Sequence, residues 1–119
     1  MFKIKRVYEE EGNDDGVRVL IDRVWPRGVS KEKADLDEWF KDAAPSTELR
    51  KWFNHETDKF SEFKEKYKEE LKTDGEKIKA VSVLLDLNKD RDVTLLYGAK
   101  DQKINHAVVL KEYLTEIAD

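Results

Sequence analysis

The feature that most constrains this chain is residues 19–28, VLIDRVWPRG, where an apolar run ends abruptly in charged residues, a tryptophan, a proline and a glycine. An uninterrupted apolar run is typical of a strand that is buried on both faces of a sheet. The proline fixes its own φ and the glycine allows a positive φ, so a rigid loop should follow the strand. The stretch predicts a buried strand that carries functional side chains into its exit loop.

The composition predicts one folded domain. A length of 119 residues is that of a single domain. Hydrophobic residues make up 39% of the chain, enough to offset the entropy of ordering despite a charged fraction of 42%. We expect a monomer or a small homo-oligomer. The net charge of −4 argues against nucleic acid as a partner, because no global positive field is available to hold phosphates.

Several classes of chemistry lack their residues. The chain has no cysteine, which excludes disulfides, thiol nucleophiles and thiolate metal sites. No glycine-rich nucleotide motif, nucleophile elbow or histidine spacing typical of a metal site is present, so we expect no metal and no cofactor. No apolar stretch approaches the roughly 20 residues of a membrane span, and the N-terminus does not resemble a signal peptide. These features predict a cytoplasmic protein without a membrane partner.

Apolar periodicity and capping residues divide the chain into strands and helices. Strands are expected at residues 2–8, 17–24 and 93–97, and the first two could pair as an antiparallel hairpin. Residues 36–44 could extend a helix or form a strand, and we favour an extended segment because Pro45 follows it. Helices are expected from Lys31, from Ser46, and over residues 60–71, 76–88 and 103–118.

This order predicts an α/β fold. We expect one domain with a mainly parallel sheet of about four strands, helices on both faces and room for one antiparallel edge strand. Ligands of such sheets bind beyond the carboxyl ends of the strands. The loops at those ends carry the candidate site residues, which are Asp22, Arg23, Trp25, Arg27, Ser46, Thr47, Lys100, Asp101, Asn105 and His106.

Two interpretations of these loops remain open. Arg23, Arg27 and Lys100, together with two helix N-termini, could bind an anion such as phosphate or carboxylate. Alternatively, Arg23 and Lys100 pair with Asp22 and Asp101, and the serine and aspartate only cap helices.

The aromatic and imidazole side chains also have two interpretations each. Trp25 could stack on a planar ligand or could close one end of the core. His106 could act as a general acid or base, or could be a solvated residue in a first helical turn. His55 follows a helix and is assigned no role.

The blocks DR-x-WPRG, APS-T-ELR-x-WF and TLLY-x-AKD, with their flanking residues, resemble the YeaO-like family, domain-of-unknown-function family 488. The similarity extends over nearly the whole chain. It implies a compact α/β domain of bacteria and archaea without an established reaction. The blocks coincide with the three loops named above, so the resemblance marks the same positions.

Two hypotheses about function follow. In the first, the chain is a small cytoplasmic binding protein or enzyme for an anionic metabolite bearing phosphate or carboxylate. Hydrolysis or group transfer is then the expected chemistry, with Asp22 or Asp101 as the catalytic proton carrier. In the second, it is a non-enzymatic regulatory or protein-interaction module in which the same charged residues form a structural salt-bridge cluster.

Overall fold

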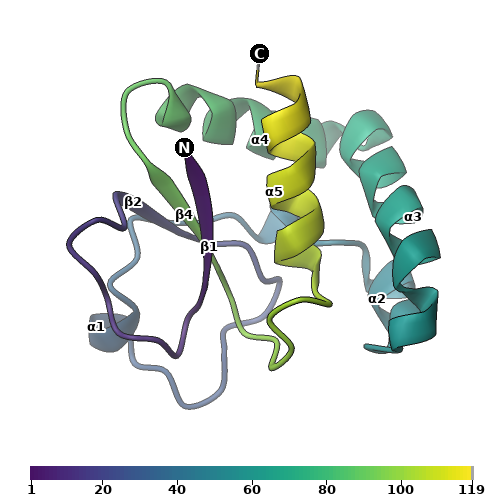
Figure 1. Ribbon diagram of the computed structural model, residues 1–119, viewed down its shortest axis with the longest axis horizontal. Coiled ribbons are helices and arrows are strands. Elements are labelled where there is room, and N and C mark those ends of the chain that lie inside the picture. Colours follow the sequence, from purple (N-terminus) through teal and green to yellow (C-terminus); the bar gives the residue numbers. More distant parts are fainter. Residues whose placement is uncertain (119) are drawn as a thin grey trace.

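The computed structural model describes residues 1–118. Its elements follow in the order expected of an α/β chain (Figure 1). The strands are β1 (Phe2–Arg6), β2 (Val17–Leu20), β3 (Glu38–Trp39) and β4 (Val93–Tyr97). The helices are α1 (Lys31–Ala34), α2 (Thr47–Phe53), α3 (Phe60–Thr73), α4 (Gly75–Asn88) and α5 (His106–Ile117), with short 3-10 turns at Lys41–Ala43 and Thr57–Lys59.

The strands form one parallel sheet in the order β1-β4-β2-β3. The last strand of the sequence is therefore central, as its continuous apolar run predicts. The expectation of an antiparallel hairpin or an antiparallel edge strand is wrong. β4 lies between β1 and β2, so a strand pairs with each of its edges while the two cores cover its faces.

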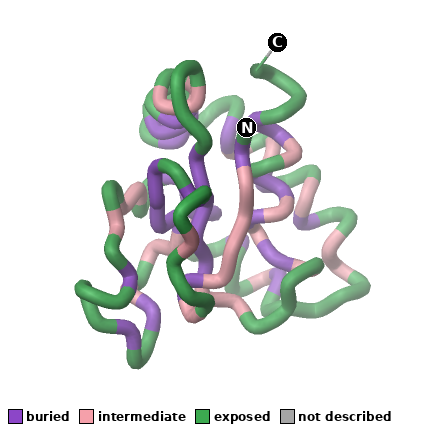
Figure 2. The backbone as a smooth tube through the Cα atoms, turned by 60° about the vertical axis from the view of Figure 1, so that its left-hand side comes forward, coloured by how far each residue is buried: buried purple, intermediate pink, exposed green. Residues whose placement is uncertain are grey.

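Successive residues of the strands point to opposite faces of the sheet. In β4, Val93, Leu95 and Tyr97 face the larger core, whereas Leu96 faces a smaller one. Helices α2 to α5 contribute the other side of the larger core, and Figure 1 shows α3 and α5 on the side of the sheet opposite α1. The smaller core is covered by α1 and the surrounding loops. Burial is concentrated in β2 and β4 and on the inward sides of the helices, whereas β1 is mostly of intermediate exposure (Figure 2).

A buried ion pair anchors the helix of the smaller face. The Nη1 atom of Arg18, a β2 residue that is 2% exposed, lies 2.5 Å from Asp15 Oδ2. The other carboxylate oxygen is 2.7 Å from Lys5 Nζ. Arg18 Nε and Nη2 donate to the carbonyl of Ala34 at the end of α1, and Nε also approaches that of Asp35. The guanidinium is thus satisfied without water and joins α1 to the sheet.

Some boundaries differ from the sequence-based expectation for local reasons. β2 ends at Leu20, since Ile21 still donates to the Leu96 carbonyl but the chain then turns away from the sheet. Residues 36–44 contain both β3 and a 3-10 turn, so the extended prediction is right only in part. α5 begins at His106 rather than near Lys103, because Asn105 is its N-cap and its side chain accepts from Val108 N–H.

No helix within residues 1–118 has both the length and the apolar character required to cross a membrane.

Candidate functional site

A pocket of about 490 Å³ lies beyond the carboxyl ends of β2 and β4, where the parallel topology predicts a ligand site. Its wall is built from the loop after β2, the segment that leads into α2, the end of α2, and the loop between β4 and α5. The polar residues that line it are Asp22, Arg23, Thr47, Arg50, Lys51, Asn54, His55, Asn105 and His106. Apolar contacts come mainly from Val24, Pro45, Phe53 and Phe63.

Asp22 is held by the backbone of the neighbouring strand. Its Oδ2 atom accepts a hydrogen bond of 2.9 Å from Gly98 N–H, directly after β4. A Cβ on Gly98 would lie 2.9 Å from that oxygen, so a glycine is needed for this approach. The backbone carbonyl of Asp22 accepts from Trp39 Nε1 at 2.7 Å. The carboxylate is therefore positioned by two other strands of the sheet.

The His106 imidazole has a defined tautomer. Its Nε2 atom lies 3.1 Å from the Ile21 carbonyl and 3.1 Å from Asp22 Oδ1. Both neighbours are acceptors, so Nε2 carries the proton, and the geometry directs it to the carbonyl. Asp22 Oδ1 is buried and accepts no hydrogen bond from residues 1–118. His106 lines the pocket beside Asp22.

Arg23 is the second residue with an unsatisfied polar atom. Its Nε atom is buried and has no hydrogen-bond partner within the described part of the chain. A buried donor without a partner costs about 1–3 kcal/mol, which a ligand or a water can recover. The pairing of Arg23 with Asp22 or Asp101, one of the two interpretations of the sequence, is absent from the ion pairs of residues 1–118.

Helix α2 supplies cations that the sequence reasoning missed. Arg50 and Lys51 are exposed and line the pocket. They occupy the middle of an amphipathic helix, where charged side chains are usually solvated, so no sequence signal distinguished them. Asn54 and His55 follow α2 with positive φ values of 48° and 56° and also line the pocket. Two consecutive non-glycine residues in this region are strained, a condition common at functional sites.

Ser46 and Asp101 act on the backbone and lie outside the lining. Ser46 Oγ accepts from Leu49 N–H as the cap of α2 and donates to Glu70 Oε2 at 2.6 Å. Asp101 Oδ1 accepts from the N–H groups of Lys103 and Ile104, and these hydrogen bonds lower the pKa of the Asp101 carboxyl. A carboxylate held ionised in this way is poorly suited to donate a proton.

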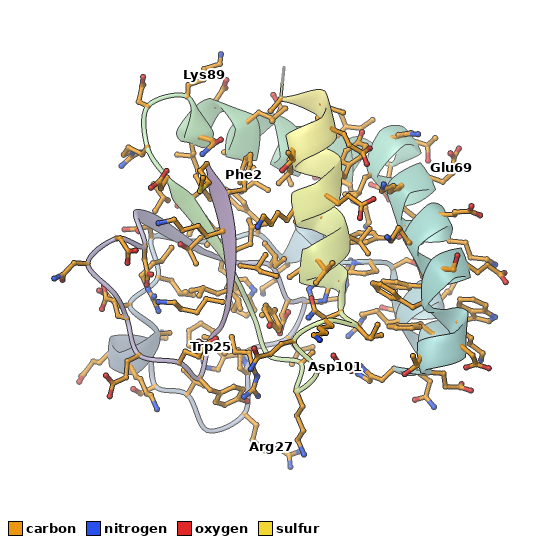
Figure 3. All side chains as sticks on the ribbon, in the orientation of Figure 1. Phe2, Trp25, Arg27, Glu69, Lys89 and Asp101 are labelled. Atoms are coloured by element: carbon orange, nitrogen blue, oxygen red, sulfur yellow. The ribbon has the colours of Figure 1, made fainter. Side chains whose placement is uncertain are left out.

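Trp25, Arg27 and Lys100 also lie outside the pocket lining. Trp25 donates from Nε1 to the Val29 carbonyl at 2.7 Å and makes an edge contact with Trp39, with ring centroids 5.3 Å apart. It therefore packs in the smaller core, which is the structural alternative for this residue. Arg27 and Lys100 are exposed, and Figure 3 shows the Arg27 side chain extending away from the body of the molecule.

Asn105 and Tyr67 support the pocket from beneath. Asn105 is 2% exposed, donates to the Asp101 carbonyl at 2.8 Å and caps α5, so its amide is already engaged. Burial raises the pKa of the Tyr67 hydroxyl well above its ordinary value, and the neutral hydroxyl donates to the Ala43 carbonyl. The Tyr67 ring meets His106 edge-on, with centroids 6.5 Å apart. Asn105 thus fixes the first turn of α5, and Tyr67 fixes the Ala43 carbonyl.

The lining suits a small anion better than a metal ion. Three cationic side chains face one carboxylate in the pocket. Within residues 1–118, no three of the residue types that bind metals form a cluster able to hold a metal ion. Arginine and lysine together bind phosphate and carboxylate groups, and the aspartate adds an acceptor for the rest of a ligand.

Comparison with known proteins places the chain in a family. A family model described as "Inactive DUF488-N3 subclade" matches residues 1–119. The chain belongs to the DUF488 family. This DUF488 chain is 44% identical over 113 residues to the "Uncharacterized protein YeaO" of Escherichia coli, covering 95% of this chain and 96% of that one.

It is also 39% identical over 112 residues to the "Uncharacterized protein Rv3073c" of Mycobacterium tuberculosis, with 94% and 92% covered. No solved structure matches the chain. The family resemblance seen in the three sequence blocks is confirmed, and the DUF488 relatives extend over the same single α/β domain.

Proposed function

We propose that this protein binds a small anionic metabolite of the cytoplasm, bearing phosphate or carboxylate, in the pocket beyond β2 and β4. The observation that carries this proposal is Arg23, whose buried Nε atom has no partner within residues 1–118 although it lies in the wall of the pocket. If Arg23 formed a structural salt bridge, a carboxylate would lie beside its guanidinium. Arg23 makes no ion pair within residues 1–118, so its guanidinium is instead available to a ligand in the pocket that it lines.

The charge of the lining supports an anion. Arg50 and Lys51 stand at the exposed side of the pocket and add to the positive field of Arg23. This local excess occurs in a chain whose net charge is −4, so it does not follow from the overall composition. Clustered cations in a concave, partly apolar site raise the local concentration of anions and bind them with direct hydrogen bonds.

Binding without turnover is the form of this function that we favour. The matching family model carries the description of an inactive subclade. The hydroxyl of Ser46, which lies between the lining residues Pro45 and Thr47, is engaged by Glu70 and by the helix cap. Within residues 1–118, no serine or threonine hydroxyl forms a hydrogen bond with Asp22 or His106, so this pair serves better in holding a ligand than as a reaction centre.

The test is a thermal-shift and calorimetric screen of phosphorylated and carboxylated metabolites against wild type, Arg23→Ala and Arg91→Ala. Arg91→Ala makes the same change in net charge as Arg23→Ala. Arg91 is exposed and lies in the turn before β4, at the end of the sheet away from the pocket. We expect at least one anion to bind wild type and Arg91→Ala equally, and Arg23→Ala roughly tenfold or more weakly.

Two results would contradict the proposal. One is that no anion of the screen binds wild type. The other is that Arg91→Ala loses as much affinity as Arg23→Ala, which would show a general effect of charge. If this protein instead binds a partner chain from the same cell, and Arg23→Ala does not weaken that binding, the interaction-module hypothesis would be favoured.

A further inference from the structure

We infer that the ligand of this pocket is a phosphate monoester whose organic part carries hydroxyl groups, the chemistry shared by sugar phosphates and nucleotides. This inference rests on the proposed function and adds the chemical class of the ligand. Three properties of the lining lead to it: its excess charge, its unsatisfied acceptor and its size.

The excess charge favours a phosphate monoester over a carboxylate. Arg23, Arg50 and Lys51 face a single carboxylate, that of Asp22, which leaves two positive charges in excess. A phosphate monoester carries a charge of roughly −1.5 to −2 at pH 7, whereas a simple carboxylate carries −1. Its three terminal oxygens can also accept from several cationic groups at once. The phosphate therefore matches the charge and the number of donors in the lining.

The acceptors show that part of the ligand is not anionic. Asp22 Oδ1 accepts no hydrogen bond from the described residues and is itself buried, although the Asp22 side chain as a whole is 19% exposed. His106 lies in the same wall, with its Nε2 atom 3.1 Å from the Ile21 carbonyl. A second anionic group placed here would be repelled by the carboxylate. A hydroxyl group can donate to the Asp22 carboxylate, which makes a polyol or sugar suitable for this part of the pocket.

The size of the pocket requires more than a phosphate. A cavity of about 490 Å³ lies within the range of small-molecule sites and would be mostly empty around inorganic phosphate. Val24, Pro45 and Phe53 provide apolar surface in its wall, against which a carbon skeleton can pack. The lining thus offers cations for the phosphate, and a carboxylate and apolar side chains for the body of the ligand.

Calorimetric titration of the wild-type protein with four phosphates tests the inference. The probes are ribose 5-phosphate, AMP, pentyl phosphate and inorganic phosphate. Pentyl phosphate is the matched control, since it has the charge and a similar length of ribose 5-phosphate without its hydroxyls. We expect ribose 5-phosphate or AMP to bind about tenfold or more tightly than pentyl phosphate, because each hydrogen bond to a charged group contributes strongly. The tighter of the two identifies the sugar phosphate or the nucleotide as the source.

Asp22→Asn gives a second, independent readout. Asparagine has the shape of aspartate but lacks its charge, so the variant should bind ribose 5-phosphate about tenfold more weakly. Its affinity for pentyl phosphate should be unchanged or higher, because a repelling charge has been removed. Retained binding of pentyl phosphate also shows that the variant is folded. If the variant does not fold, the comparison of the two esters on wild type decides the matter alone.

The outcomes separate this inference from the function on which it rests. If pentyl phosphate binds as tightly as ribose 5-phosphate and AMP, or if Asp22→Asn weakens all esters equally, the hydroxyl-bearing class is wrong and anion binding stands. If carboxylates of the earlier screen bind and no phosphate does, the same conclusion follows. If no anion binds at all, the proposed function itself falls.

Discussion

Asp15 is the residue whose charge matters most to the smaller face of the sheet. It is 3% exposed, and it pairs with Arg18 and Lys5. Burial alone would raise the pKa of its carboxyl, but hydrogen bonds from Lys5, the Gly12 N–H and Arg18 outweigh that effect and lower the pKa below 3.8. Loss of this carboxylate would leave the guanidinium of Arg18 as a buried charge without its counterion.

We therefore expect Asp15→Asn to lower the free energy of unfolding at pH 7 by roughly 3–5 kcal/mol. A depressed carboxyl pKa stabilises the folded state above the unfolded pKa, and the stabilisation is lost as pH falls through the folded value. The wild-type advantage should accordingly shrink below about pH 4. Urea unfolding at pH 7 and pH 3 measures both effects.

Asp14→Asn is the matched control for that experiment. The Asp14 side chain is 87% exposed and lies 3.6 Å from Lys3 Nζ, so its removal should change the free energy of unfolding by less than about 1 kcal/mol. A loss for Asp15→Asn no larger than that of Asp14→Asn would show that the buried pair does not stabilise the fold.

At the scale of single residues, the sequence identified part of the pocket lining. Asp22, Arg23, Thr47 and Asn105 line the pocket, as expected from their places after strands or at helix starts. Trp25, Arg27 and Lys100 do not, although they stand in the same loops. Spacing along a loop cannot give the direction of a side chain, which depends on where the loop turns and on which side its apolar neighbours are buried.

Among the elements, the stability of helix α2 depends strongly on one serine, Ser46. A helix of seven residues is too short to be stable alone, and it needs tertiary contacts. Ser46 stabilises α2 in two ways. Its Oγ caps the helix by accepting from Leu49 N–H, and its N–H and hydroxyl both donate to Glu70 of α3. The exposed cations of the pocket lie on this helix, so the serine positions them indirectly.

We expect Ser46→Ala to lower the free energy of unfolding by roughly 2 kcal/mol, the sum of a lost cap and a lost hydrogen bond to a carboxylate. Ser30→Ala is the control, since Ser30 makes a single cap contact, with Lys33 N–H, at an exposed position. Its loss should cost about 0.5 kcal/mol. Equal effects of the two substitutions in denaturant unfolding would exclude a special role for the contact with α3.

The sequence predicts helices well where one apolar periodicity dominates, and predicts the ends of helices less well. The stripe of Phe63, Tyr67 and Leu71 identifies α3, and all three are buried. The start of α5 was placed too early, because residues 101–104 form a turn held by the Asp101 side chain. Capping contacts of this kind depend on side-chain geometry. Helix propensity is similar on either side of the start of α5, so it does not predict where the helix begins.

For the whole molecule, the central strand divides two cores of different construction. Leu95 and Leu96 are neighbours in β4 and both are fully buried, but they face opposite sides of the sheet. Leu95 is surrounded by strands and long helices, whereas Leu96 lies against α1 and loops. Loops can move into a cavity more readily than packed helices can.

Leu95→Ala should therefore be more destabilising than Leu96→Ala. We expect losses in the free energy of unfolding of roughly 4–5 kcal/mol and 2–3 kcal/mol, respectively, which denaturant titration of both variants would measure. The two substitutions remove the same atoms from adjacent positions, so the difference reports the surroundings alone. A larger loss for Leu96→Ala would show that the loop-covered face is the more rigidly packed one.

The sequence by itself determined the α/β class, the central buried strand and the family, because these depend on hydrophobic period, on long apolar runs and on blocks of local sequence. The tertiary structure decided that β4 inserts between β1 and β2, and that Arg50 and Lys51 meet Arg23 and Asp22 in one pocket. Strand order and side-chain convergence arise from contacts between residues far apart in the chain. Local sequence patterns contain no such distances, so these features required the folded structure.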